Sequence, residues 1–302
     1  MLVVKCVLPG SCDANCDFCC WTKGNSNKKA FVDNFNELLD RLSQTHGTEY
    51  SVNITGGEPL LSPVFKEVLT SLKVRHAKGT LGTATINTNG SNLHRWIDQI
   101  GPEFRYVNIS RHHHDDEVNR NIFKSTTVPS LNDLGHFFDL FAYRGVETGI
   151  NLVRTKHTSV DTIIELRKFA TNHNVGRVAV REEFKNGLHA SNLEYTLLNN
   201  AAKIHEFSCE TCRYVILATE YGEVTLQYGE EEPNALLEQY DVAELIMHSD
   251  GKLSLDYNKE RIIPMIDVEK YIVPSMYSHH WGGCGGGQGS GPRIVRISHL
   301  MQ

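Results

Sequence analysis

The sequence has no long hydrophobic run. None of its apolar stretches approaches the roughly 18 residues that a membrane-spanning helix needs. The opening segment MLVVKCVLPG is short and is soon interrupted by proline and glycine, so it does not match the apolar region of a signal peptide. These absences predict a protein without a membrane span that works in the cytoplasm.

Basic residues are not concentrated anywhere along the chain, and the formal net charge at pH 7 is −6. Proteins that bind long nucleic acids carry basic patches for the phosphates, so a large nucleic-acid partner is disfavoured. Internal repeats are absent as well, and the one low-complexity segment is the glycine-rich stretch at residues 281–292. The 302 residues are enough for one barrel domain with a small appendage.

Short apolar runs alternate with helical periods over the first two thirds of the chain. The runs predict strands at residues 2–8, 50–55, 83–88, 106–110, 148–153 and 177–181. Helical periods lie at residues 31–42, 63–74, 93–100, 131–143 and 160–171. Such alternation implies parallel strand pairing. Six strands are too few for a closed eight-stranded barrel, so we expect an α/β fold, a partial (β/α)6 TIM-like barrel.

The pattern changes from about residue 206. The segment CRYVILATEYGEVTLQYG predicts two strands around Tyr221 and Gly222, in the manner of an antiparallel hairpin. We therefore expect a barrel over residues 1–205 and a small C-terminal α+β domain over residues 206–302.

Three of the eight cysteines, Cys12, Cys16 and Cys19, follow the first predicted strand at the spacing C-x3-C-x2-C. In a reducing compartment such clustering indicates metal or redox chemistry rather than disulfides. Barrel folds place their chemistry at this carboxyl end of the strands. Three thiolates can hold an iron–sulfur cluster and leave one iron open, whereas a structural zinc takes four protein ligands. The alternative is a coincidence of ordinary core cysteines.

The triad, with Phe18 before its last cysteine, resembles the radical S-adenosylmethionine (SAM) superfamily. Further stretches at successive strand ends agree with it: TGGEPLL at residues 55–61 and NTNG at residues 87–90. The resemblance implies a [4Fe-4S] cluster on the three cysteines, and SAM bound by its open iron. It also implies cofactor contacts at Gly56, Gly57, Glu58, Pro59, Thr88, Asn89 and Ser110. Bare glycines suit this place because a side chain would block close approach of the ligand to the backbone.

The segment from residue 148 to residue 184 is similar to the cyclase subgroup that opens molybdenum-cofactor biosynthesis, and it implies that Asn151 and Arg154 face the cofactor. Residues 209–224 resemble the segment of that subgroup that holds an auxiliary cluster. Here the third cysteine is missing near its expected place, and the only later one is Cys284. Cys209, Cys212 and Cys284 could hold a second cluster. They could equally bind zinc together with His205 or His279, or be ordinary thiols.

The stretch SRHHHDDEVNR at residues 110–120 departs from the cyclase pattern. Arg111, His112 and His113 would begin at the rim of the barrel, so we predict that at least one of them faces the substrate. The alternative is a solvated polar loop. Glu182 and Glu183 end the sixth strand and are further candidates for contacts, or plain strand-end charges.

The C-terminal glycine tract, residues 281–293, surrounds Cys284 and precedes Arg296. It could fold over the barrel mouth or be a flexible connector. Of the remaining cysteines, Cys6 is expected in the core and Cys20 without a ligand.

The resemblance as a whole implies an enzyme that reductively cleaves SAM to a 5′-deoxyadenosyl radical, which abstracts hydrogen from a small polar substrate such as a nucleotide or nucleoside. A flavodoxin or ferredoxin would then supply the electron. Two alternatives stay open. One is an enzyme that modifies a ribosomally made peptide, and the other is a non-catalytic iron–sulfur redox sensor.

Overall fold

The computed structural model describes residues 2–19, 21, 26–182, 197, 201–208, 212–229, 238–239, 243–255 and 259–265. The helices of this part are α1 (Lys28–His46), the 3-10 turn η1 (Pro59–Leu61), α2 (Phe65–Ala77), α3 (Leu93–Trp96), α4 (Asp116–Phe123), α5 (Leu131–Tyr143) and α6 (Val160–Asn172). No helix of the described residues is long and apolar enough to cross a membrane.

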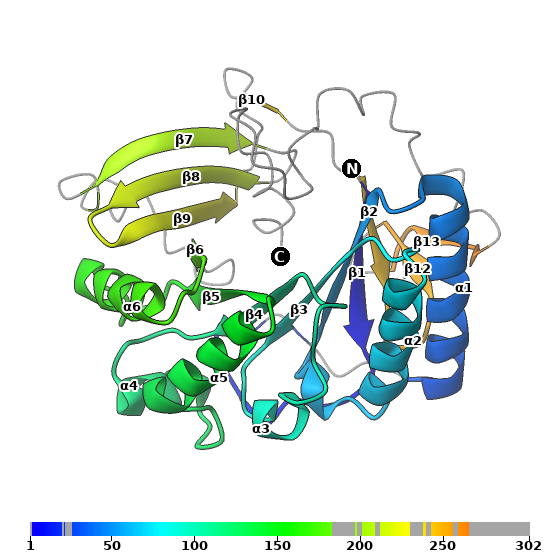
Figure 1. Cartoon of the computed structure of the whole chain (residues 1–302), viewed down its shortest axis with the longest axis horizontal. Helices are drawn as coiled ribbons and strands as arrows, with labels where there is room; N and C mark the ends of the chain where they lie inside the picture. The colour runs from blue at the N-terminus through cyan, green and yellow to red at the C-terminus, as the bar shows by residue number, and fades with distance from the viewer. Residues whose placement is uncertain are drawn as a thin grey trace.

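The first six strands form a parallel sheet. They are β1 (Leu2–Leu8), β2 (Tyr50–Gly56), β3 (Thr83–Thr88), β4 (Tyr106–Ser110), β5 (Glu147–Val153) and β6 (Arg177–Arg181). They pair in chain order, each parallel to the next, and helices connect them (Figure 1). All six strands predicted from the sequence are confirmed, and with them the partial TIM-like barrel.

Alternating strand positions explain how the sheet is covered. Val4, Val52 and Ile86 point to the helical side, where they are fully buried with Phe31 and Phe35 of α1 in one apolar core. Burial of such side chains contributes about 1.5–3 kcal/mol each. The opposite positions form the inner face of the barrel and are largely polar.

The predicted helices are confirmed with shifted ends, and one helix was missed. The helical period expected at residues 93–100 gives only the short α3, which ends at Trp96. In contrast, α4 arises inside the stretch that reads as a polar loop. The side chain of Asp115 caps it by accepting a hydrogen bond from the Val118 N–H (2.8 Å), and Ile122 and Phe123 are buried.

The remaining strands come from the C-terminal third: β7 (Ala202–Ser208), β8 (Cys212–Thr219), β9 (Gly222–Gly229), β10 (Glu238–Gln239), β11 (Ala243–Met247), β12 (Leu253–Ser254) and β13 (Ile262–Ile263). The predicted hairpin is confirmed as β8 and β9, which pair antiparallel from Thr219 opposite Gly222.

These C-terminal strands extend both edges of the parallel sheet. Strand β9 pairs parallel with β6, and β11 pairs parallel with β1. The strand order in the described residues is β10-β7-β8-β9-β6-β5-β4-β3-β2-β1-β11-β12-β13, and the two end strands do not pair with each other. The C-terminal region is therefore joined to the barrel by strand pairing, and the division at residue 205 stays a prediction.

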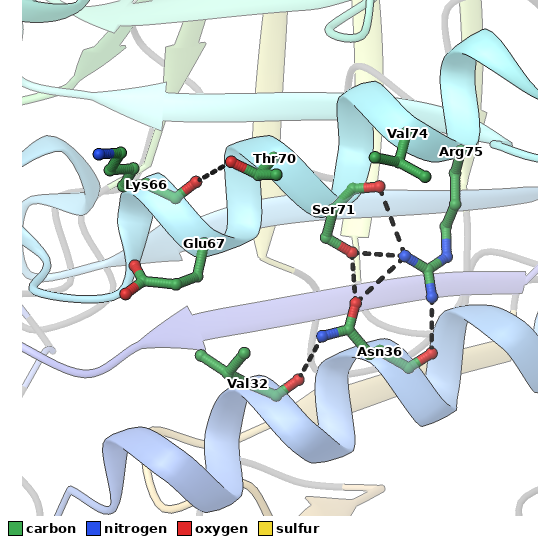
Figure 2. Close-up of a pocket in the computed structure, with 8 residues that line it drawn as sticks. All are labelled: Val32, Asn36, Lys66, Glu67, Thr70, Ser71, Val74 and Arg75. Carbon is green, nitrogen blue, oxygen red and sulfur yellow. Dashed lines mark hydrogen bonds between the residues drawn. The ribbon is translucent and has the colours of Figure 1, made fainter.

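The outer surface between α1 and α2 carries a groove lined by Val32, Asn36, Lys66, Glu67, Thr70, Ser71, Val74 and Arg75 (Figure 2). Arg75 crosses from α2 to α1, where it donates to the Asn36 carbonyl (3.0 Å) and to Asp40 (2.6 Å). All lining residues come from these two helices and none from a strand end. The groove thus reflects helix packing on the outer side of the barrel.

The turn between β11 and β12 docks on the start of α1, and Gly251 makes this possible. Its φ is +83°, and a Cβ would lie 2.8 Å from the Ala30 carbonyl oxygen. Gly79 has a similar φ of +67°, but nothing lies within 4 Å of its Cβ position.

We expect Gly79→Ala to lower the free energy of unfolding by about 1 kcal/mol, because it adds only the strain of a positive φ. Gly251→Ala should cost about 1–3 kcal/mol more, because the methyl group also meets backbone that cannot move away. Urea unfolding of both variants beside the unmodified protein measures this. Equal losses would show that the turn does not press on α1.

Candidate functional site

The loops that follow β1 and β2 touch through backbone atoms. The Glu58 N–H donates to the Ser11 carbonyl (3.0 Å). A Cβ on Gly57 would lie 2.8 Å from the Ser11 oxygen and 3.1 Å from the Cys12 nitrogen, and one on Gly56 would lie 3.0 Å from the Leu8 oxygen. The glycines are needed at these places so that the two loops can approach each other. The sequence interpretation gave a different reason, the approach of a ligand.

Glu58 is a buried carboxyl that joins the end of β2 to the end of β3. Its Oε1 accepts hydrogen bonds from the Thr88 hydroxyl (2.6 Å) and the Leu60 N–H (2.9 Å), and its Oε2 accepts from the Asn89 N–H (2.7 Å). Burial raises the pKa of Glu58 to about 7, although these hydrogen bonds act in the opposite direction. Pro59 starts the turn η1 directly behind it.

The Asn89 side chain carries the connection on to the cysteine loop. Its Nδ2 donates to Asp13 Oδ1 (2.8 Å) and lies 3.9 Å from the Cys12 sulfur, while Thr127 donates to Asp13 Oδ2 (2.8 Å). Burial alone would raise the pKa of Asp13, but hydrogen bonds from Ser91, Asn89 and Thr127 outweigh it and lower the pKa. Sequence reasoning missed Asp13, whose only signal was its place after the first cysteine.

The three cysteines lie together on this loop and are partly exposed. Burial raises the pKa of Cys12, and it raises the pKa of Cys16 to about 12, with neighbouring thiolates of the triad adding to both shifts. Three thiolates so close need a compensating cation, which the irons of a cluster supply. The donor set therefore fits an iron–sulfur cluster. No three His, Cys, Asp or Glu side chains of the described residues gather as ligands of a single metal ion.

His112 is buried behind the cysteine loop. Its ring packs edge to face against Phe18 (centroids 4.9 Å apart) and lies tilted against the ring of Phe123 of α4 (4.6 Å). Its Nδ1 accepts from the Val153 N–H (3.0 Å), so the neutral ring carries its proton on Nε2. Burial lowers the pKa of His112 to about 3, and the charge of Arg111 adds to the shift. The ring thus supports the residue before Cys19.

Arg111 and His113 also hold the loop after β4. Arg111 is 1% exposed and forms an ion pair with Asp116 (2.6 Å), and it also donates to the carbonyls of His113 and Pro129. The Nδ1 of His113 accepts from the Asp115 N–H (3.0 Å), and its ring stacks on His114. A substrate-facing role for Arg111, His112 or His113 stays a prediction.

Ser110 and Asn151 are brought side by side, because they face each other in the pairing of β4 with β5. The Arg154 N–H donates to the Arg181 carbonyl (2.7 Å) beyond the end of β5, and the Glu182 N–H donates to the Gln227 carbonyl (3.0 Å). Asn151 also takes part in a hydrogen-bonded row of inner-face side chains that sequence reasoning missed. It consists of Asn53, Asn87, Asn108, Asn151 and Arg177.

Several predicted positions lie outside the described residues: Cys20, Glu183, Cys209, His279, Cys284, Arg296 and the glycine tract. For Cys212 the structure describes the backbone at the start of β8 and not the side chain.

Low pH should destabilise the folded state through protonation of His112. The unfolded chain binds a proton at this residue below pH 6.5, whereas the folded chain does so only near pH 3, so the contribution of His112 is present above pH 6.5 and is lost as the pH falls. From pH 7 to pH 5 we expect the free energy of unfolding to fall by about 2 kcal/mol more in the unmodified protein than in the variant His112→Asn. The asparagine can still accept a hydrogen bond from the Val153 N–H, but it does not titrate. Urea unfolding at the two pH values tests this, and parallel losses would contradict it.

Comparison with known proteins agrees with this geometry. The family model of the radical SAM superfamily matches residues 7–142, the part of the chain that contains the cysteine triad and the loops tied to it. This match covers less than half of the chain and makes residues 7–142 similar to a radical SAM domain.

Curated proteins with a known activity are also similar to this chain in sequence. The GTP 3′,8-cyclase of Caulobacter vibrioides is 29% identical over 164 residues, which cover 53% of this chain and 45% of that protein. The GTP 3′,8-cyclase of Agrobacterium fabrum is 28% identical over 167 residues, with coverage of 53% and 45%. The chain thus matches about half the length of these curated relatives.

Solved structures share the fold. Streptococcus suis SuiB bound to S-adenosylmethionine superimposes with a TM-score of 0.54 at 15% identity, over 85% of this chain and 60% of that one. The enzyme anSMEcpe with bound AdoMet and the Kp18Cys peptide gives a TM-score of 0.59 at 14% identity, over 91% and 81% of the two chains. At these identities the likeness extends to the fold alone.

Proposed function

We propose that this protein is a radical SAM enzyme that generates a substrate radical by hydrogen abstraction. The observation that carries the proposal is the hydrogen-bonded junction of three loops: Glu58 joins the ends of β2 and β3, and Asn89 joins β3 to Asp13 beside Cys12. A site built only to store a cluster would not need the loops after β2 and β3 to be fixed against the cysteine loop.

Cys12, Cys16 and Cys19 would hold the [4Fe-4S] cluster. When bound, the cluster and SAM supply a one-electron cleavage of the sulfonium that yields methionine and a 5′-deoxyadenosyl radical. The chain's own residues would bind and orient. Gly56 and Gly57 let the loops approach, and Glu58 fixes the backbone of Asn89.

The inner-face residues at the ends of β4 and β5 would contact SAM. Ser110 and Asn151 lie on neighbouring strands in register, and Arg154 follows just beyond. Their role is to position the cofactor and to keep water from the reacting atoms. No general acid or base is required for hydrogen abstraction.

The substrate we propose is a small polar molecule, with a nucleotide or nucleoside favoured because the matched relatives are GTP 3′,8-cyclases. Peptide modification has weaker support, since the peptide-bound neighbours share the fold at low identity. A flavodoxin or ferredoxin in the cytoplasm would deliver the electron. A second cluster on Cys209, Cys212 and Cys284 would help to hold the substrate.

The anaerobically reconstituted protein with dithionite and SAM should release 5′-deoxyadenosine and methionine, or an adenosyl adduct of a bound acceptor. Replacing Cys12, Cys16 and Cys19 together by alanine should abolish this release, because no thiolates remain to hold the cluster. Liquid chromatography with mass detection measures the products.

Cys6→Ala is the matched control. Cys6 is 1% exposed and points into the core on the helical side of β1, so this variant should keep the cluster and the cleavage. An intact, reduced cluster that cleaves no SAM would favour the redox sensor instead.

A second cluster has its own test. The variant that lacks Cys12, Cys16 and Cys19 should still bind close to four irons after reconstitution, as expected for one cubic cluster. The additional replacement of Cys209, Cys212 and Cys284 by alanine should remove them. Iron analysis and electron paramagnetic resonance give the result. An iron-free first variant would rule out the auxiliary cluster and leave the chemistry of the barrel untouched.

A further inference from the structure

Five polar side chains form a continuous hydrogen-bonded row across the inner face of strands β2 to β6. Asn87 Nδ2 donates to Asn53 Oδ1 (2.6 Å), and Asn151 Nδ2 donates to Asn87 Oδ1 (3.0 Å). Arg177 Nη2 donates to Asn151 Oδ1 (3.3 Å) and to Asn108 Oδ1 (3.1 Å). We call this row the asparagine relay. Each member comes from a different strand.

Arg177 fixes the direction of the relay. A guanidinium has N–H donors and no acceptor, so Asn151 and Asn108 must turn their oxygens toward it. Asn151 then turns its NH2 group toward Asn87, and Asn87 accepts this hydrogen bond with its oxygen. Asn87 in turn offers its NH2 group to the oxygen of Asn53. One charged donor thereby sets the orientation of all four carboxamides.

Gly149 allows Arg177 to span β5. In the sheet register Asn108, Gly149 and Arg177 lie opposite one another on three adjacent strands. A Cβ on residue 149 would lie 2.5 Å from Asn108 Oδ1 and 3.6 Å from Arg177 Nε. A side chain there would push Asn108 out of the reach of Arg177, so the missing side chain is part of the relay's construction.

The direction of the relay decides which ligand groups it can meet. Each carboxamide oxygen accepts one hydrogen bond within the relay, whereas the guanidinium of Arg177 has only donors, so the charged end of the relay can meet a ligand only through N–H groups. Asn87 and Arg177 are only half-buried, whereas Asn53, Asn108 and Asn151 are buried. A ligand on the inner face would therefore meet carboxamide groups and, at one end of the relay, the positive charge and N–H donors of Arg177.

Further cations stand on the same inner face, although the chain carries a net charge of −6. Lys5 stands opposite Asn53 in the pairing of β1 with β2, and Arg181 lies four residues beyond Arg177 on the same face of β6. The inward-facing Glu147 is the first residue of β5, two residues before the Gly149 that stands opposite Arg177, and it forms an ion pair with Arg105 (2.7 Å).

We propose that the asparagine relay is the floor of the substrate site and that it binds a carboxylate or phosphate group of the substrate, with Arg177 as the residue that sets this specificity. The proposal rests on the proposed function, because it places the anionic group inside the barrel below the site of radical formation. Charge-assisted donation from Arg177 to an anionic oxygen is stronger than donation between neutral groups.

Calorimetric titration of the full-length, reconstituted protein in the presence of SAM tests the proposal. Sodium pyrophosphate probes the phosphate class and sodium succinate the carboxylate class, with chloride keeping the ionic strength constant. We expect one of them to bind, and Arg177→Met to weaken that binding at least tenfold. Arg177→Lys, which keeps the charge and donors, should recover most of it. The matched control Arg105→Met should bind like the unmodified protein.

The proposal is overturned if neither anion binds, or if Arg177→Met binds as tightly as the unmodified protein. If Arg177→Met does not fold, Arg177→Gln takes its place, since its amide still donates to Asn151 but carries no charge, and the same loss is expected. Release of 5′-deoxyadenosine is measured separately. Anion binding that depends on Arg177 without SAM cleavage would refute the proposed function alone, and SAM cleavage without anion binding would refute the relay alone.

Discussion

The site depends on one buried carboxyl group. Glu58 accepts hydrogen bonds from the loop that it begins and from Thr88 and Asn89 at the end of the next strand. A buried polar group left without these partners would cost about 1–3 kcal/mol, so the ends of β2 and β3 are held in one arrangement. Asn89 then contacts Asp13, and the cysteine loop takes its place from strand ends that are far from it in sequence.

Much of this architecture could be predicted because it is encoded locally. Apolar runs predicted the six barrel strands, and their alternation with helical periods predicted that these strands pair in parallel. The glycine and cysteine motifs indicated the strand ends at which the candidate site lies. The pairing of β9 with β6 and of β11 with β1 could not be predicted in this way. Parallel partners from distant segments leave no local pattern, since their register follows from packing of the whole sheet. The helix α4 was missed because it is short and mostly polar, so its few buried apolar residues do not form a clear helical period.

The same difference between local patterns and contacts of distant segments holds for the side chains of the site. A run of histidines after a strand looks like a polar rim, yet tertiary packing buries His112 between Phe18 and Phe123. Asn87 stands out only as the first residue of the NTNG stretch, and Arg177 reads as an ordinary strand residue. Only the register of five strands joins them into a relay. Residue type and spacing identify candidate ligands within one loop, whereas contacts across strands require the structure.

The central claim is that the loops after β1, β2 and β3 form one pocket for a cluster and SAM. Electron–nuclear double resonance on the reduced, reconstituted protein tests it most directly, with SAM labelled by ¹⁵N in the amino group and ¹³C in the carboxylate of its methionyl part. The account predicts hyperfine coupling of both labels to the cluster. Bound SAM without such coupling, beside an intact reduced cluster, would contradict it.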